Sequence, residues 1–271
     1  MQTKALHIED LHMSYKDTVG HQFSKPRALG FFEKSEVSSD SELISGANFD
    51  LENGETICIG GQSGLGKSAL LRVIAGLERP TSAKMYYFGE YIPPERHTAL
   101  EIANRQVGLV FQNGALISNL RIRDNIALPL HYHKKGSPKE IEEKVNMAMD
   151  LMRVRSEAEL FPHQLSIGMQ KRVAIARSWA MDPKLLLMDE PTAGLDNYNR
   201  RNLLPLIDNM RILFKTSIII VSHDLLMAKE LGCNLSFLYN KDITKPKPFD
   251  YWLNADNEIS RVLFRDLRNH E

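Results

Sequence analysis

The stretch Gly61-Gln62-Ser63-Gly64-Leu65-Gly66-Lys67-Ser68 decides the fold. It follows an apolar β-type run at residues 56–59 and opens a helical run at residues 69–75. The spacing of its glycines, lysine and serine is that of a P-loop, whose backbone N–H groups surround the phosphates of a nucleotide. Glycines are needed because the backbone must approach anionic oxygens in conformations that a Cβ would obstruct. The sequence therefore predicts a nucleotide site at a strand-to-helix turn.

Two side chains of this loop predict its chemistry. Lys67 places a cation at the β- and γ-phosphates, and Ser68 offers a hydroxyl ligand to Mg²⁺. The helix that follows points its positive end at the same anions. The four fixed positions match a random sequence at roughly 4 × 10⁻⁵ per site, or about 1% over a chain of this length. We therefore expect ATP and Mg²⁺ as ligands. The nucleotide-binding residues expected in this loop are Gly61, Gln62, Ser63, Gly64, Leu65, Gly66, Lys67, Ser68 and Ala69.

Length, charge and cysteine content limit the class of protein. A chain of 271 residues forms one large domain, or one domain with an inserted subdomain. Hydrophobic residues make up 43% and charged residues 25%, as in ordinary globular proteins, and the net charge of +0 gives no sign of a nucleic-acid partner. The N-terminus lacks an apolar signal core and no apolar run approaches about 18 residues, so we expect no membrane span. The two cysteines, Cys58 and Cys233, favour a reducing compartment.

The pattern of apolar runs predicts an α/β fold. Strand patterning covers residues 1–15, then 49–51 and 55–59 on either side of a turn at Asn53-Gly54, then 85–92 and 107–111. Continuous apolar runs at 185–188 and 218–221 alternate with helical stretches, which predicts a mainly parallel sheet buried on both faces. Residues 113–165 show helical spacing without β-runs, and they predict an inserted helical subdomain.

Two carboxylates follow the apolar run at 185–188. In an open α/β sheet, ligands lie at the carboxyl ends of the strands, where Asp189 and Glu190 fall. Asp189 fits the role of holding Mg²⁺, and Glu190 fits the base that polarises the attacking water. Pro191 disfavours the right-handed helical region for Glu190, so we expect this carboxylate to extend from the strand end.

Three further positions point to the same site. His223 follows the strand at 218–221 and would reach the γ-phosphate, although a lone histidine is more often structural. Gln112 follows the strand at 107–111 and would give an oxygen to Mg²⁺ or water, unless it is a simple turn residue. Ser166 and Gly168 open a second helix whose N-terminus suits phosphate, although a plain capped helix has the same pattern. Two such helix ends and one P-loop indicate that another subunit completes each nucleotide site.

These motifs, with Gly194-Leu195-Asp196 before His223, occur in an order that resembles the nucleotide-binding subunit of ABC transporters over most of residues 1–240. The resemblance implies a P-loop NTPase (RecA-like) core, ATP hydrolysis, and a homodimer that encloses two ATP molecules head to tail. It places Ser166 and Gly168 on the γ-phosphate of the opposite subunit, Asp196 in the D-loop, and Tyr15 against adenine. It also implies transmembrane permease partners and a peripheral position on the cytoplasmic face of the bacterial inner membrane. Ile167 and Met169 depart from the usual glycine and glutamine of the signature.

A finer resemblance concerns the cargo. Residues 111–116, 124–130 and 168–172 look like the phospholipid-transport ATPases associated with MCE proteins (Mla-type). That branch implies phospholipid movement between membranes, an MCE substrate-binding protein and a small accessory protein. The alternatives are the ATPase of another ABC importer, a cell-division ABC complex, and a soluble ABC ATPase outside transport.

Two segments lie outside the resemblance, which divides the chain into an ATPase domain at 1–245 and a C-terminal extension at 246–271. Within the ATPase domain, the helical subdomain falls at about 113–170. The first segment outside the resemblance is an irregular insertion at about 16–45, which is either a surface insertion or a contact with a partner or membrane. In the extension, a capped run from Asn254 predicts a short amphipathic helix that packs on its own domain or docks a partner. Its apolar face carries Ile259, Val262, Leu263 and Leu267.

Overall fold

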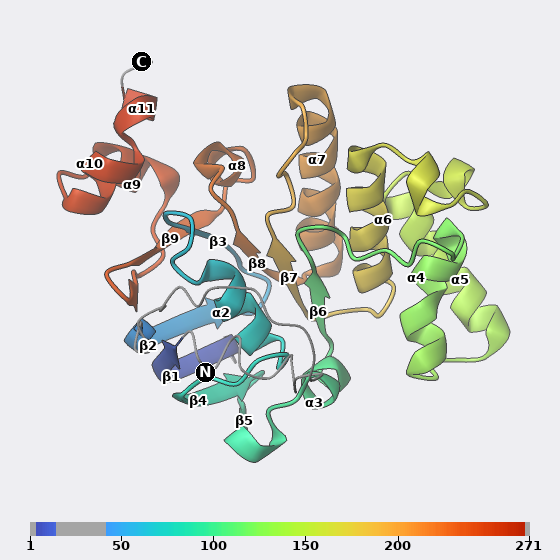
Figure 1. Ribbon diagram of the computed structural model, residues 1–271, viewed down its shortest axis with the longest axis horizontal. Helices are drawn as coiled ribbons and strands as arrows, with labels where there is room; N and C mark the ends of the chain where they lie inside the picture. The colour runs from blue at the N-terminus through green and yellow to red at the C-terminus, as the bar shows by residue number, and fades with distance from the viewer. Residues whose placement is uncertain (1–3, 15–41, 269–271) are drawn as a thin grey trace, which may run out of the picture.

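The structure is a computed structural model that describes residues 4–14 and 42–268. Tyr15 and residues 16–41 of the expected insertion lie outside these ranges. Within them, the strands form a four-stranded antiparallel sheet and a six-stranded, mostly parallel sheet, with helices between and beside them (Figure 1). The predicted α/β class is confirmed.

The N-terminal sheet has the order β2-β1-β4-β5. Its strands are β1 (Lys4–Ser14), β2 (Glu42–Glu52), β4 (Ser82–Tyr87) and β5 (Glu90–Ile92). Two predictions were wrong here. Residues 42–45 belong to β2, and the strand expected at 85–92 is a hairpin that turns at Phe88 and Gly89, which have φ values of 52° and 83°. Positive φ at two consecutive residues closes a tight turn.

The second sheet has the order β10-β9-β3-β8-β7-β6. Its strands are β3 (Thr56–Gly60), β6 (Val107–Val110), β7 (Leu185–Asp189), β8 (Ser217–Val221), β9 (Asn234–Tyr239) and β10 (Asp242–Ile243). All neighbours are parallel except β9 and β10. The turn at Asn53-Gly54 carries the chain from one sheet into the other, so it does not join a hairpin. The register pairs Val221 with both Ile59 and Asp189, which brings the carboxyl ends of β3, β7 and β8 to one edge.

Alternate residues of each central strand enter different cores. Leu185 and Leu187 face α2 (Lys67–Ile74) and the N-terminal sheet, whereas Leu186 and Met188 face the opposite side. That side is covered by α6 (Ile167–Trp179), α7 (Asn197–Phe214) and α8 (Leu225–Glu230), as Figure 1 shows. The continuous apolar runs therefore reflect a sheet buried on both faces.

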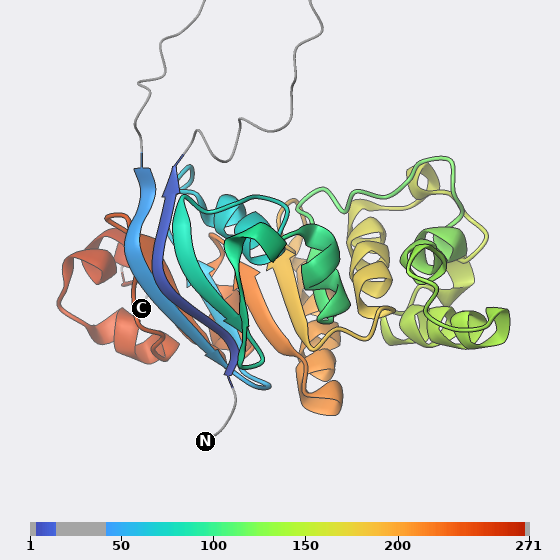
Figure 2. The ribbon, with the colours of Figure 1, turned by 90° about the horizontal axis from the view of Figure 1, so that it is seen from below.

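The segment from residue 111 to residue 166 contains no strand. It carries α4 (Ile122–Tyr132), α5 (Pro138–Leu151) and the short 3₁₀ helices η2 (Arg155–Glu157) and η3 (Pro162–Gln164). Ser137 and Glu140 form a capping box that starts α5. These helices extend to one side of α6, away from the sheets (Figure 2). Two short elements, η1 (Pro94–Arg96) and α3 (Ala99–Asn104), precede β6; η1 has no buried residue, and α3 buries Ile102.

The chain ends in α9 (Phe249–Asn254), α10 (Glu258–Leu263) and α11 (Arg265–Arg268), where a single amphipathic helix was expected. Phe249, Trp252 and Phe264 are buried around Phe237 of β9. The apolar residues Ile259, Leu263 and Leu267 pack against the same core, while Val262 is 45% exposed. The apolar face of this region therefore packs on its own chain.

Candidate active site

The P-loop leaves β3 and enters α2 through two glycines that cannot carry a side chain. A Cβ on Gly61, at φ 141°, would lie 2.7 Å from the carbonyl oxygen of Leu238. Gly66 caps α2 with a φ of 95°, a conformation that strains other residues. The loop is thus pressed against β9 and points the N-terminus of α2 into the site, as phosphate binding requires.

Lys67 is the buried cation of this loop. Its side chain is only 7% exposed, and its Nζ donates to the carbonyl oxygens of Gly61 and Gln62, each at 2.8 Å. Burial lowers the pKa of Lys67, and the nearby charges of Glu190 and Asp189 oppose that effect. An ammonium held among backbone oxygens at a helix N-terminus suits the phosphates of a nucleotide.

Ser68 and Asp189 form the cation side of the site. The Ser68 hydroxyl donates to Asp189 Oδ1 at 2.9 Å. Burial raises the pKa of Asp189, the Ser68 hydrogen bond opposes that rise, and the negative charge of Glu190 adds to it. These hard oxygens fit Mg²⁺, which uses one or two carboxylates and takes its other ligands from phosphates and water. Among the described residues, no three His, Cys, Asp or Glu side chains form a cluster that could hold a metal ion.

Glu190 leaves the sheet in an unusual conformation. Glu190 has a φ of 47°, which lies outside the right-handed helical region that Pro191 was expected to disfavour, and its amide donates to the carbonyl of Val221 at 2.9 Å. The chain turns back there and holds the carboxylate over the end of β8. Glu190 Oε2 accepts from the Ser222 hydroxyl at 3.1 Å and lies 2.9 Å from His223 Nδ1, and Oε1 accepts from the His223 amide at 3.1 Å. A strained backbone with an over-determined side chain is typical of a functional position.

Some of these groups line one cavity of about 340 Å³, whereas Asp189, Ser222 and His223 are not among its lining residues. Gln112, Glu190 and the adjacent Lys67 and Ser68 reach it from three different segments of the chain. Leu43 and Arg72, which the sequence did not single out, also contribute. The full lining is Leu43, Ser63, Gly64, Gly66, Lys67, Ser68, Ala69, Arg72, Gln112 and Glu190.

Ser166, Gly168 and Asp196 are not among the residues that line this cavity. Ser166 caps α6 by accepting from the Met169 amide at 3.3 Å, and a Cβ on Gly168 would lie 2.9 Å from Asn199 Oδ1. Asp196 caps α7 by accepting from the Asn199 amide at 2.7 Å, a bond that lowers the pKa of Asp196. The N-terminus of α6 and the start of α7 thus contact each other, and neither lines the P-loop cavity of the same chain. Of the two departures in the signature, Ile167 is 59% exposed and Met169 packs on the core.

Comparison with known proteins agrees with this arrangement. The family model described as "ABC transporter" matches residues 44–193. The chain belongs to the ABC transporter family. It is similar to a probable sulfate/thiosulfate import ATP-binding protein of Chlorella vulgaris, with 36% identity over 74% of this chain and 83% of that protein. It is also similar to a lipoprotein-releasing system ATP-binding protein of Chlorobium chlorochromatii, with 34% identity over 67% of this chain and 74% of that protein.

Solved structures show the same fold. A dimeric bacterial ABC transporter cassette, MJ0796, matches with a TM-score of 0.74 and 24% identity over 90% of this chain and 98% of that one. The chain is thus an ATP-binding subunit of the ABC type, and its reaction is ATP hydrolysis. No helix in the described part of this subunit has both the length and the apolar character needed to cross a membrane.

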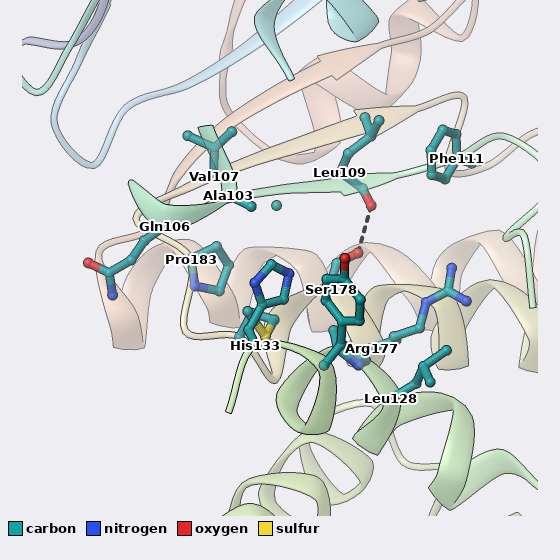
Figure 3. A pocket seen from close by; sticks show the side chains of 14 residues that line it. Ala103, Gln106, Val107, Leu109, Phe111, Leu128, His133, Arg177, Ser178 and Pro183 are labelled. Atoms are coloured by element: carbon teal, nitrogen blue, oxygen red, sulfur yellow. Dashed lines mark hydrogen bonds between the residues drawn. The ribbon is translucent and has the colours of Figure 1, made fainter. Parts of the chain in front are cut away.

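A second cavity of this ABC subunit lies between β6 and the helical region. We call it the α4–β6 groove; its volume is about 440 Å³. Figure 3 shows Leu109 and Phe111 on one wall and Leu128, Arg177 and Ser178 on the other. Phe111, Leu128 and Tyr132 are 37%, 41% and 77% exposed. The groove therefore offers apolar side chains to solvent next to Gln112. Its full lining is Ala103, Gln106, Val107, Gly108, Leu109, Phe111, Leu128, Pro129, Tyr132, His133, Arg177, Ser178, Met181 and Pro183.

Sequence reasoning missed several contacts of the ABC site. Ser222 directly follows β8 and precedes His223. Its hydrogen bond to Glu190 could therefore have been predicted from the alignment of the strand ends. Lys171 is 5% exposed and donates to the carbonyl oxygens of Gln112 and Glu190, the latter at 3.0 Å. The sequence marks Lys171 only as a basic residue on the buried face of α6. Arg72 is paired with Glu78 at 2.6 Å, and nothing local marks that position as part of the cavity.

Proposed function

We propose that two copies of this chain form an ATP-hydrolysing dimer that drives a membrane transporter. One observation carries the proposal: the Glu190 carboxylate lies beside the P-loop cavity that Lys67 and Ser68 line, fixed by Ser222 and His223. A carboxylate so placed accepts the proton of a water that attacks the γ-phosphate in line. Lys67 neutralises phosphate charge. Ser68, Asp189 and Gln112 would hold Mg²⁺, which would supply further charge stabilisation when bound. His223 orients the water and the base.

The second copy supplies what the cavity lacks. Ser166 and Gly168 stand at the N-terminus of α6, where the backbone N–H groups and the helix dipole favour an anion. They do not line the P-loop cavity of their own chain. We therefore place them on the γ-phosphate bound by the partner subunit, with Asp196 beside the junction. Tyr15 is proposed to stack on adenine.

The permease is proposed to dock at the α4–β6 groove. The groove exposes Phe111 and Leu128, and it adjoins Gln112, so a segment seated there would contact the chain next to the catalytic cavity. We further propose, from the family resemblance, that the dimer lies peripherally on the cytoplasmic face of the bacterial inner membrane. The resemblance of residues 111–116 to family members that work with permeases supports the same partner.

Two cargo classes compete. The motifs around Ala115 and Met169 favour phospholipid, moved with an MCE-type protein and an accessory subunit. The relatives favour the alternative, since one is named for sulfate/thiosulfate import and another for lipoprotein release. The ATPase does not contact the cargo, so residues of this chain do not decide between them; the relatives give the alternative more support.

Purification of the membrane complex through a tag on this chain tests the proposal. Mass spectrometry of the recovered subunits and of any bound lipid is the measurement. A permease and an MCE-type protein with phospholipid would establish the lipid reading. A permease with another substrate-binding protein would establish the importer alternative. Recovery of the chain without any membrane subunit would contradict the transport role.

A further inference from the structure

We propose that Lys171 is a positioning residue that ties Glu190 to the segment at residues 109–115, so that ATP hydrolysis depends on where that segment lies. This inference rests on the proposed function, because it takes Glu190 as the base. It concerns a residue of α6 that contacts neither the nucleotide cavity nor a carboxylate side chain through the hydrogen bonds described above.

The contacts of Lys171 are with two backbone carbonyls. Its Nζ donates to the Gln112 oxygen and, at 3.0 Å, to the Glu190 oxygen. The Glu190 carbonyl also accepts from the Ala193 amide at 3.2 Å. Because that second donor holds the turn after β7, loss of the ammonium would leave the turn formed. What would be lost is the connection between Glu190 and Gln112.

The charge and burial of Lys171 make this connection strong. The side chain is only 5% exposed, so its ammonium is largely removed from water. A buried ammonium must satisfy its three N–H groups locally, and charge-assisted bonds to carbonyls are stronger than neutral ones. Lys171 therefore keeps both carbonyls within its reach and transmits a displacement of one to the other.

The rest of α6 holds the same segment. Arg177 donates to the carbonyl oxygens of Gly114 and Ala115, each at 2.7 Å, and the Ser178 hydroxyl donates to that of Leu109 at 2.7 Å (Figure 3). Arg177 and Ser178 also line the α4–β6 groove. A partner that enters the groove thus contacts the segment whose Gln112 carbonyl is bound to Lys171. Four hydrogen bonds from side chains of α6 hold the segment at residues 109–115, and a fifth, from Lys171, reaches the Glu190 carbonyl.

Steady-state ATPase measurements on the full chain test the inference. Lys171→Met is expected to lower kcat between about tenfold and about 100-fold, the range for a displaced catalytic group, with KM for ATP within about twofold of wild type. K171R, which keeps charged donors at the same place, is expected to restore most of the activity. Val173→Ala is the matched control, because it empties space in the fully buried part of the same helix without touching either carbonyl. It should lower the melting temperature and leave kcat unchanged.

A second measurement tests the connection itself. Arg177→Lys loosens the segment by losing the bidentate contact and is expected to lower kcat in the wild-type background. In the K171M background it should have no further effect, because the segment then no longer reaches Glu190. Full additivity of the two effects, or wild-type kcat in folded K171M, would overturn the inference and leave the proposed function intact. If K171M does not fold, K171Q is judged by the same criteria. Absence of hydrolysis by the wild-type chain would instead overturn the proposed function.

Discussion

Glu190 is the residue on which the chemistry depends. Its φ of 47° is costly for a residue with a side chain. Two donors, the Ser222 hydroxyl and the His223 amide, fix its carboxylate, and His223 Nδ1 lies 2.9 Å from it. The sequence predicted that Glu190 lies at the sheet edge, because an apolar run that ends in two carboxylates is a local pattern. It did not predict the turn, because the left-handed conformation results from packing against β8, which is distant in sequence.

The substitution Glu190→Gln tests the role of the base. It keeps the size of the side chain and most of its hydrogen bonds but cannot accept a proton. We expect turnover to fall at least about 100-fold, the lower range for loss of a general base, with ATP affinity unchanged. Equilibrium binding and phosphate release are the two measurements. Near-normal phosphate release in this variant would exclude Glu190 as the base.

His12 gives a second residue-scale prediction, on stability. Its Nδ1 lies 3.1 Å from Glu42 and its Nε2 lies 3.1 Å from Asp10, and these hydrogen bonds raise the pKa of His12 above its usual value. Only the imidazolium has an N–H for both carboxylates. The stabilisation is therefore complete below the unfolded-state pKa and is lost as pH rises through the higher folded-state pKa.

The difference in unfolding free energy between wild type and His12→Gln measures this effect. Denaturant titrations from about pH 5 to about pH 9 should show the wild-type advantage shrinking as pH rises. His7, between Asp50 and Glu9, has a raised pKa of the same origin and remains in both proteins as an internal reference. A difference that stays constant with pH would show that the His12 contacts do not depend on its charge.

At the scale of elements, motif spacing predicted that the strands and helices exist more accurately than it predicted where each one begins and ends. The P-loop, α2 and the buried strands follow from short-range patterns, and the structure has them. The predicted turn at Asn53-Gly54 joins strands of two different sheets, since β3 pairs with β8 and β9, which lie far along the chain. Residues 42–45 read as irregular because β2 begins with polar Glu42 and with Ser45-Gly46, although it pairs with β1 over its whole length. In both cases, pairing with strands distant in sequence determined the structure, and a local pattern does not show such pairing.

The C-terminal helices illustrate the same limit and give an element-scale prediction. Trp252 is 5% exposed, and its Nε1 donates to the Leu235 carbonyl at 2.9 Å, so it fastens α9 to β9. Trp252→Ala should lower the free energy of unfolding by about 3–5 kcal/mol, as for other buried aromatic truncations. Val262→Ser, at a 45% exposed position, should change it by less than about 0.5 kcal/mol. Denaturant titration of both variants checks this, and equal losses would contradict the packing described.

At the scale of the whole molecule, we propose that one chain carries two half-sites, because the residues at the N-terminus of α6 do not line the P-loop cavity. In that proposal, an anion-binding group of the partner completes the cavity with Lys67 and Glu190 at the γ-phosphate, and the N-terminus of α6 binds the anion of the partner's site. Motif order in the sequence was enough to infer two subunits, because it revealed two helix ends of the phosphate-binding kind and one P-loop. The finer assignment of cargo rested only on the resemblance of residues 111–116, 124–130 and 168–172, and it stays a proposal.

The central claim is that ATP joins two copies through Ser166, and the molecular mass under ATP tests it most directly. The Glu190→Gln chain should double its mass in sedimentation equilibrium when Mg²⁺ and ATP are added, because ATP is bound and not consumed. Ser166→Arg in the same background should bind ATP and keep the mass of one chain, since the larger side chain obstructs closure. Ser156→Arg, at an exposed serine of η2, is the control and should still pair. A single-chain mass for Glu190→Gln with ATP bound, or pairing that survives Ser166→Arg, would contradict the account.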